Sequence, residues 1–136
     1  MNDIELMYRE NILDNYKNPR NKGKIDNPTV HHREFNPLCG DEIELFLTIE
    51  ENKVVDVKFF GQGCAISQAS VSILTEKIKG KTLEELKQIT KEDIFEMIGV
   101  PLSPVRIKCG LLGWDTMKNS ILIYEKYVNE EENGKQ

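Results

Sequence analysis

The stretch Asn36-Pro37-Leu38-Cys39-Gly40-Asp41-Glu42 places a thiol and a carboxylate two residues apart around a glycine, directly before an alternating apolar pattern. In an extended segment, residues i and i+2 lie on the same side of the chain. Gly40 also permits a turn that a larger residue would resist. Cys39 and Asp41 are therefore expected to converge on one metal ion, and we interpret this stretch as half of a metal site.

The residues that follow predict an antiparallel β-hairpin. Apolar residues alternate with polar ones from position 43 to 49 and from 55 to 59, with Phe46 as the exception in the first run. This alternation is the period of a half-buried strand. A polar turn at residues 50–53 separates the runs, so antiparallel pairing is expected. The hairpin joins the first cysteine stretch to the second, Gly61-Gln62-Gly63-Cys64-Ala65-Ile66-Ser67.

Helical spacing of apolar residues predicts most of the remaining chain. We expect helices at residues 3–16, 64–79, 82–89, 90–98 and 110–128, a basic surface loop at 20–28 and a strand at 29–35. Gly80 and Gly99 are placed to end two of these helices. Thr82-Leu83-Glu84-Glu85 fits a capping box. Residues 105–108 are expected to be extended and to lead into the last helix.

The third cysteine, Cys109, lies in the stretch Arg106-Ile107-Lys108-Cys109-Gly110. Cys64 and Cys109 both fall at predicted helix N-termini, where the helix dipole favours a thiolate over a thiol. Arg106 and Lys108 add positive charge, which lowers the pKa of a thiol further and favours Cys109 as the nucleophile. Three thiols and the carboxylate of Asp41 together make four ligands.

Such a ligand set suits two metals. Stable electron-transfer iron–sulfur clusters are usually held by four thiolates, so one carboxylate makes a weaker and more exchangeable site for iron. Zinc accepts three sulfurs and one oxygen equally well. His31 and His32 are interpreted as solvated or half-buried histidines, and Asp115 as a solvated position beside a core aromatic, Trp114.

Length and composition limit the class of protein. The 136 residues suffice for one hydrophobic core, and we expect a single domain at residues 1–128 followed by a flexible acidic tail at 129–136. The net charge of −5 disfavours nucleic-acid binding. Neither a signal peptide nor a membrane-spanning run is evident, so a cytoplasmic protein is expected. Three cysteines suggest free or metal-bound thiols rather than disulfides.

The three cysteine stretches together resemble the U-type iron–sulfur scaffold family, which comprises IscU, SufU and the N-terminal domain of NifU. The similarity covers nearly the whole chain. It rests on Asn36-Pro37-Leu38-Cys39-Gly40-Asp41, on Gly61-Gln62-Gly63-Cys64-Ala65-Ile66-Ser67-Gln68-Ala69-Ser70 and on Val105-Arg106-Ile107-Lys108-Cys109. It implies an α+β fold in which helices pack on one face of a small, mostly antiparallel sheet.

The resemblance also implies a function. In this family a cysteine desulfurase, which is a pyridoxal-phosphate enzyme, donates persulfide sulfur to a scaffold. The scaffold assembles a transient [2Fe-2S] cluster and passes it to recipient apo-proteins, so it is not itself expected to be an enzyme. By this resemblance Cys39, Asp41, Cys64 and Cys109 are the ligands of iron, of the cluster or of zinc.

Two features of the sequence give conflicting indications of whether the chain resembles the IscU or the SufU branch of the family. Lys108 stands where IscU has a histidine, as in the zinc-binding SufU branch, yet the inserted segment usual in SufU is absent. IscU-like chemistry would use Cys109 as the first sulfur acceptor, and SufU-like chemistry would use Cys39. Residues 102–106, Leu-Ser-Pro-Val-Arg, correspond to the Leu-Pro-Pro-Val-Lys motif that IscU offers to a chaperone. A zinc-dependent sulfurtransferase and a zinc-stabilised adaptor are therefore the alternatives to a scaffold.

Overall fold

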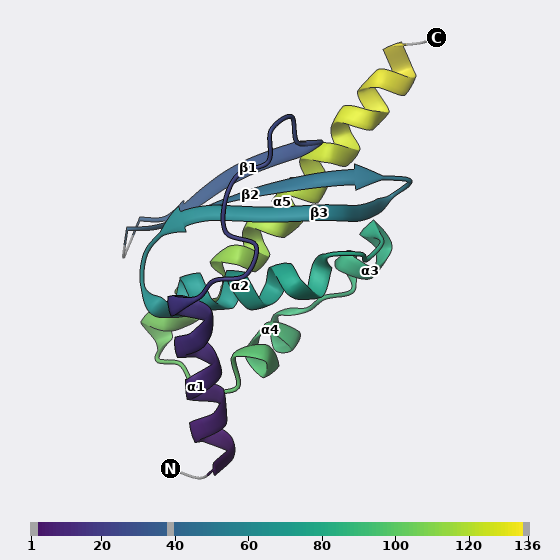
Figure 1. Ribbon diagram of the computed structural model, residues 1–136. Coiled ribbons are helices and arrows are strands. Elements are labelled where there is room, and N and C mark those ends of the chain that lie inside the picture. Colours follow the sequence, from purple (N-terminus) through teal and green to yellow (C-terminus); the bar gives the residue numbers. More distant parts are fainter. Residues whose placement is uncertain (1–2, 38–39, 135–136) are drawn as a thin grey trace.

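The computed structural model describes the backbone of residues 3–37 and 40–134 and the side chains of residues 8–37 and 40–132. The three strands form one antiparallel sheet in the order β1-β2-β3, and the helices lie on one side of it (Figure 1). This is the α+β architecture predicted from the sequence. In chain order the elements are α1 (Asp3–Lys17), β1 (Val30–Asn36), β2 (Asp41–Glu50), β3 (Lys53–Gln62), α2 (Ala65–Ile78), α3 (Leu83–Lys87), α4 (Lys91–Ile98) and α5 (Pro104–Gly134).

The strand register brings the ends of several elements together. Asn36 pairs with Asp41 across β1 and β2, and Glu42 pairs with Gln62 across β2 and β3. The predicted hairpin is confirmed, and its turn residues Glu51 and Asn52 have φ values of 52° and 60°, a backbone twist that matches the flanking strands. The start of β2, the end of β3 and the beginning of α2 consequently share one end of the sheet.

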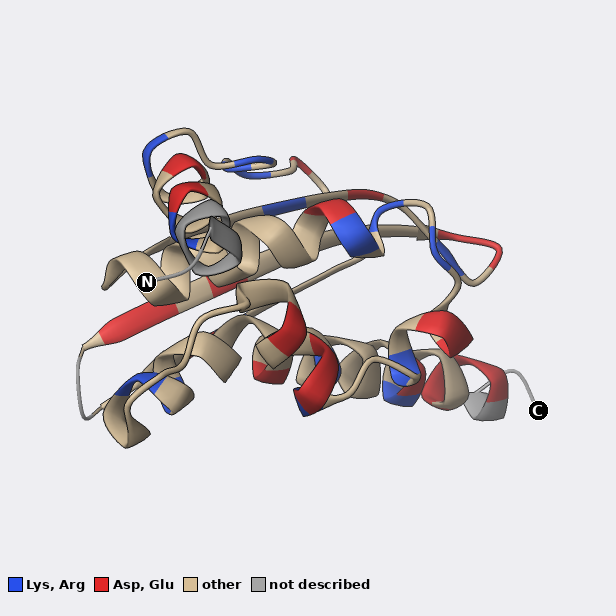
Figure 2. Cartoon of the chain, turned by 90° about the horizontal axis from the view of Figure 1, so that it is seen from below, with Lys and Arg blue, Asp and Glu red and all other residues tan. Residues whose placement is uncertain are grey.

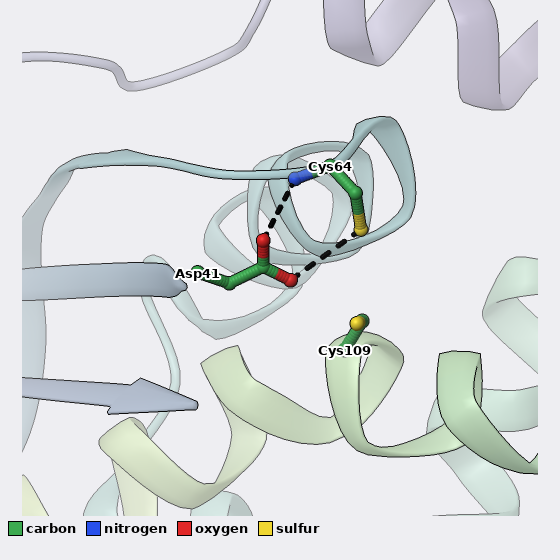
Figure 3. Close-up of side chains that lie close together, drawn as sticks. All are labelled: Asp41, Cys64 and Cys109. Atoms are coloured by element: carbon green, nitrogen blue, oxygen red, sulfur yellow. Dashed lines mark hydrogen bonds between the residues drawn. The ribbon is translucent and has the colours of Figure 1, made fainter. Parts of the chain in front are cut away.

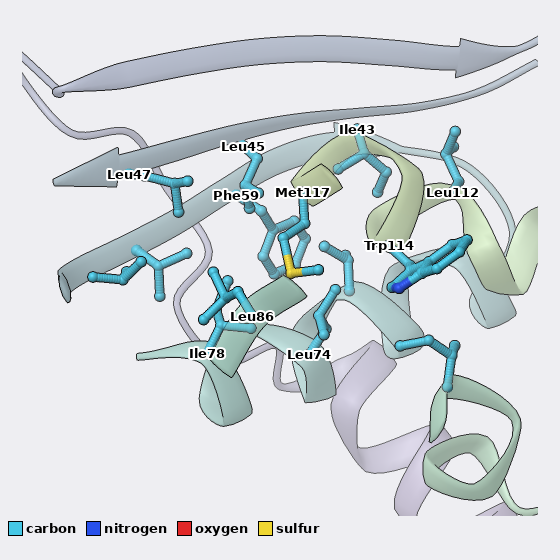
Figure 4. Close-up of a cluster of buried hydrophobic side chains, with 14 of the residues drawn as sticks. Ile43, Leu45, Leu47, Phe59, Leu74, Ile78, Leu86, Leu112, Trp114 and Met117 are labelled. Carbon is cyan, nitrogen blue, oxygen red and sulfur yellow. The ribbon is translucent and has the colours of Figure 1, made fainter. Parts of the chain in front are cut away.

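The core lies between the inner face of the sheet and helices α2 and α5 (Figure 4). Every second residue of β2 and β3 points into this core from the sheet. The fully buried ones are Ile43, Leu45, Leu47, Val57 and Phe59. Residues of α2, α3 and α5 complete it: Leu74, Ile78, Leu86, Leu112, Trp114 and Met117. The end of the sheet beyond this core is where the functional side chains collect.

Phe46, the exception in the apolar alternation, lies on the outer face of the sheet yet is only 7% exposed. His31 stacks on its ring, with the centroids 5.9 Å apart.

The segment between α1 and β1, predicted as a surface loop, follows the edge of β3: the amide of Gly23 donates to the Phe59 carbonyl, and the amide of Phe59 donates to the Asn21 carbonyl. This segment then crosses in front of the sheet (Figure 1).

Both short helices in the middle of the chain have defined ends. The predicted capping box at Thr82 and Glu85 is confirmed, and a second box joins Thr90 and Asp93 at the start of α4. Gly99 ends α4 in the left-handed region, with φ 73°, as expected for a helix C-terminus. These caps fix where the chain turns toward Pro104 and α5.

The prediction that α5 begins near residue 110 is wrong. The helix begins at Pro104, and the carbonyl of Ser103 accepts hydrogen bonds from the amides of Arg106 and Ile107. Proline suits the first position of a helix because its missing N–H would have no intrahelical partner there. Residues 105–108 are therefore helical rather than extended.

Helix α5 also continues through Gly134, so the described part of the predicted acidic tail is helical. The flexibility of residues 129–136 stays a prediction. Both acidic and basic residues occur on the helices, and basic residues lie at the start of α5 (Figure 2). Within the described residues, no helix combines the length and the apolar character needed to cross a membrane.

Candidate metal centre

Asp41, Cys64 and Cys109 meet at the end of the sheet where β2 and α2 begin (Figure 3). Each offers one ligand atom, and these atoms all lie within 4.8 Å of one another. In the part of the chain that the structure describes, no other group of three or more Cys, His, Asp or Glu residues is this close. Cys39, the fourth predicted ligand, lies outside the described residues.

Asp41 is the first residue of β2 and is 1% exposed. Its Oδ1 accepts a hydrogen bond from the backbone N–H of Cys64 at 2.9 Å. A buried carboxylate is costly unless such donors stabilise it, and the unpaired amides at a helix N-terminus are well suited to that role. The other oxygen, Oδ2, lies 3.4 Å from the sulfur of Cys64.

Cys64 is the N-cap residue of α2, as the sequence predicted, with φ −70° and ψ 163°. Its side chain does not cap the helix, and its sulfur points toward Asp41 and Cys109 (Figure 3). Cys64 is partly exposed, whereas Cys109 is fully buried.

Cys109 lies in the second turn of α5 rather than at its N-terminus, because the helix starts at Pro104. Its thiol donates to the carbonyl of Val105 at 3.8 Å, one turn earlier. The prediction that Cys109 lies at a helix N-terminus is therefore wrong, whereas Cys64 does lie at one. Burial also restricts how an external sulfur donor can reach Cys109.

Arg106 supplies the positive charge at this centre. The nearby Cys64 raises the pKa of Arg106 above its usual value, and hydrogen bonding to Cys109 and Cys64 adds to this effect. Arg106 precedes Cys109 by three residues, so both lie on the same side of α5. Lys108, predicted to contribute alongside it, is exposed and one residue from Cys109, a spacing at which helical side chains do not face each other.

Glycine is required where the chain passes the carboxylate. Gly63 has φ +151°, and a Cβ atom there would lie 2.4 Å from Oδ1 of Asp41. Gly40 adopts φ +71° in the turn before β2, a conformation that glycine reaches without steric cost. The turn predicted at Gly40 is therefore confirmed.

The geometry fits a tetrahedral metal. Metal–ligand distances of about 2.3 Å to sulfur and 2.0–2.2 Å to oxygen place two such ligands roughly 3.5 Å apart at a tetrahedral angle. The observed separation of Cys64 Sγ and Asp41 Oδ2 is 3.4 Å. Soft thiolates together with a carboxylate suit zinc or the iron of a cluster.

Two features near the centre were missed from sequence. The hydroxyl of Ser70 donates to the carbonyl of Gly110 at 2.8 Å and so fixes α5 against α2 beside Cys109; a serine on the buried face of a predicted helix was the available signal. His32 and Glu34 lie on the helix-facing side of β1, next to Asn119 of α5. No sequence signal linked these two to the helix.

Comparisons with known proteins agree on one family. The family described as NifU-like N terminal domain matches residues 7–131. The zinc-dependent sulfurtransferase SufU of Bacillus subtilis (strain 168) is 38% identical, covering 97% of this chain and 96% of that protein. The iron–sulfur cluster assembly scaffold protein IscU of Thermotoga maritima is 36% identical, covering 87% of this chain and 94% of its own.

A solved structure extends this similarity to three dimensions. The crystal structure of FiSufU from Fervidobacterium islandicum AW-1, described as an iron–sulfur cluster assembly scaffold protein for the SUF system, superposes with a TM-score of 0.73. It is 36% identical, and the match covers 86% of this chain and 98% of that one. The similarity therefore extends over most of the fold.

Proposed function

The chain belongs to the family of NifU-like N-terminal domains, and from that membership we propose that it is a scaffold for iron–sulfur cluster assembly. The convergence of Asp41, Cys64 and Cys109 within 4.8 Å carries the proposal. Cys39 completes the ligand set, as the sequence pattern predicts. Iron and sulfide are the cargo of this site.

Asp41 makes the site suited to release as well as binding. A carboxylate oxygen is a weaker ligand for cluster iron than a thiolate. The amide of Cys64 holds Oδ1 of Asp41, so Oδ2 can bind or leave the metal without the whole side chain changing position. Arg106 lies beside Cys64 and Cys109, and its positive charge would offset the negative charge of thiolate ligands.

The sulfur donor that fits this role is a cysteine desulfurase, and recipient apo-proteins take the finished cluster. Cys39 is the first sulfur acceptor favoured by our proposal, because Cys109 is fully buried in α5. A chaperone that binds residues 102–106 is a further proposed partner. Val105 in that segment is 64% exposed, so its side chain is accessible to such a partner.

Metal analysis tests the scaffold proposal directly. Zinc, iron and acid-labile sulfide are measured per chain in protein purified without oxygen from cells that co-produce a matched cysteine desulfurase. Near-stoichiometric iron and sulfide with visible cluster absorbance are expected, and Cys64→Ser should remove both. Ser67→Ala is the matched control, because Ser67 contacts Cys64 without belonging to the ligand set. Protein that contains neither iron nor sulfide would contradict the proposal.

A zinc-dependent sulfurtransferase is the second candidate. The 38% identity to SufU over nearly the full chain favours it, as does Lys108 before the third cysteine. In this case zinc is resident, and the desulfurase frees one thiolate, which then accepts sulfur as a persulfide. Zinc-loaded protein should form a persulfide on Cys39 without iron. If the zinc form accepts no sulfur from its cognate desulfurase, this candidate is excluded.

A further inference from the structure

Strand β1 has a polar inner face where a buried face is normally apolar. Positions 30, 32, 34 and 36 point toward the helices, and they are Val30, His32, Glu34 and Asn36. Opposite them, Leu112, Asp115 and Asn119 of α5 line a cleft of about 470 Å³ together with His32 and Glu34. The seam between β1 and α5 therefore contains an imidazole, two carboxylates and an amide.

Two atoms in this seam are buried without a hydrogen bond to any described residue. Nε2 of His32 and Oε2 of Glu34 are shielded from solvent, and neither forms a hydrogen bond with any described residue. Asn119 holds the other carboxylate oxygen, Oε1, by donating to it at 2.6 Å. The carboxylate is thus fixed in orientation while its second oxygen remains available. Burying such atoms unpaired is costly, which points to a ligand that satisfies both.

The distance between the two side chains matches ligands that share one metal ion. Nε2 of His32 lies 3.5 Å from Oε1 of Glu34 without forming a hydrogen bond. Two atoms bound to one metal ion at about 2.0–2.2 Å and a tetrahedral angle lie roughly 3.4 Å apart. The imidazole and the carboxylate are therefore close enough to bind one ion, which the unpaired Oε2 of Glu34 would reach while Asn119 holds Oε1. The residues flank position 33 on one side of a strand, so the backbone sets this spacing.

The charge of the cleft also favours a cation. Burial raises the pKa of Asp115, and the negative charge of Glu34 raises it further. Lys118 and Lys91 lower it only in part, and their ammonium groups lie over the ring of Trp114. Arg33 also lines the cleft, but its guanidinium approaches the carboxylate of Glu42, 4.0 Å away. Neither Glu34 nor Asp115 forms an ion pair with a Lys or Arg among the described residues.

We propose that His32 and Glu34, joined by Asp115, form a second metal site for a divalent transition ion held by nitrogen and oxygen. Imidazole and carboxylate ligands suit Zn²⁺, Fe²⁺, Co²⁺ and Ni²⁺. Asp115 lines the same cleft; the three side chains are not all within 4.8 Å of one another, so in this proposal Asp115 moves toward the pair when the ion binds. Asn119 orients Glu34 from outside the coordination shell.

This site is distinct from the cysteine centre but close to it. Glu34 lies two residues along β1 from Asn36, the partner of Asp41, which is about 7 Å. Asp115 lies about 9 Å along α5 from Cys109 at 1.5 Å per residue. The two sites share no ligand, so the second goes beyond the proposed function and does not depend on it.

Cobalt titration separates the two sites by their ligands. The full chain is first loaded with one equivalent of Zn²⁺ to occupy the thiols and is then titrated with Co²⁺. We expect one Co²⁺ with d–d absorbance and without thiolate charge-transfer bands. His32→Gln and Glu34→Gln should lower its affinity at least tenfold, and Asn119→Ala about tenfold, the usual effect of losing a residue that orients a ligand. His31→Gln is the matched control, because His31 is exposed on the other face.

Nuclear magnetic resonance gives a measurement that needs no variant of the site. The chain has only two histidines, so their ring protons are assigned by comparison with His31→Gln. Paramagnetic Co²⁺ should shift or broaden the His32 ring signals and leave those of His31 much less affected. Absence of a second bound Co²⁺, charge-transfer bands from thiolate, or unchanged affinity in folded His32→Gln would each overturn the proposal. Failure to find iron and sulfide on the cysteines would leave it standing.

Discussion

Gly63 and Asp41 are packed so closely that one methyl group should disable the cysteine centre. A Cβ at residue 63 would lie 2.4 Å from the Asp41 carboxylate, so Gly63→Ala must push that side chain away from Cys64. We expect zinc affinity to fall at least tenfold, as it does when a ligand loses its orientation. A competition titration with a chromophoric chelator measures this.

The matched control for that change is Gly80→Ala. Gly80 also has a positive φ, +87°, but open space surrounds its Cβ position. Both variants therefore place alanine at a positive φ, a strain on the order of 1–3 kcal/mol, and only one disturbs Asp41. Equal zinc affinities in the two variants would contradict the steric argument.

Replacing Asp41 tests its role in release. Asp41→Ala removes the weak ligand and should leave a bound cluster longer-lived, with slower transfer to an apo-ferredoxin. Transfer is followed by circular dichroism of the holo-ferredoxin. The variant also unpairs the amide of Cys64, so its folding is checked separately. A folded variant that transfers at the wild-type rate would show that Asp41 does not set lability.

Individual side chains were predictable from sequence where local pattern determines them. Cys64 at a helix start and Asp41 after a glycine turn follow from spacing and backbone rules. The burial of Cys109 and the position of Arg106 do not, because both depend on how α5 packs. His32 and Glu34 lie beside α5 for the same reason, and their partners are more than eighty residues away in the chain, as the 85-residue separation of Glu34 and Asn119 illustrates.

At the scale of an element, the capping box of α4 provides a stability test. The hydroxyl of Thr90 accepts from the amide of Asp93, and Asp93 accepts from the amide of Thr90. Thr90→Ala removes one of these bonds and should lower the free energy of unfolding by about 1 kcal/mol. Urea denaturation measures it. Thr90→Ser keeps the hydroxyl and should remain within a few tenths of wild type; a similar loss in both variants would assign the effect to the lost methyl group.

Element types were more predictable than element boundaries. The hairpin and α4 follow from alternation and capping residues close in sequence. The start of α5 did not, because the four residues after Pro104 are alternately apolar and basic, a pattern that suits a strand. The helix starts here because the carbonyl of Ser103 accepts hydrogen bonds from the first turn and because the fixed φ of Pro104 suits the first helical position. The spacing of apolar residues carries no information about either effect.

For the whole molecule, metal removal should reduce stability. An ion that binds only the folded chain stabilises it by about 2.7 kcal/mol at a free concentration one hundred times its Kd. Zinc-loaded protein should therefore unfold at a higher temperature than chelator-treated protein in differential scanning calorimetry. Cys64→Ser should greatly reduce the difference. If chelation leaves the melting temperature of the wild type unchanged, the bound metal contributes nothing to folding, which also argues against a zinc-stabilised adaptor.

The overall fold was predictable because one apolar alternation specifies the central hairpin and the helices follow as amphipathic segments. The polar seam between β1 and α5 was not predictable. The sequence of β1 alone, with His32 and Glu34 on one face, is typical of a strand whose polar face is exposed to solvent. Only the packing of β1 on α5 makes that face internal.

Helix α5 runs unbroken from the cysteine centre to Gly134, well past the end of the sheet (Figure 1). Between Cys109 and its last turn the helix covers roughly 35–40 Å at 1.5 Å per residue. A spin label or fluorophore attached at Tyr127, which is 58% exposed and precedes the segment predicted to be flexible, would lie roughly 27 Å along the helix axis from Cys109. The signal of such a label depends on its distance from a bound metal, so it could report occupancy of the cysteine centre in real time without any change to a ligand.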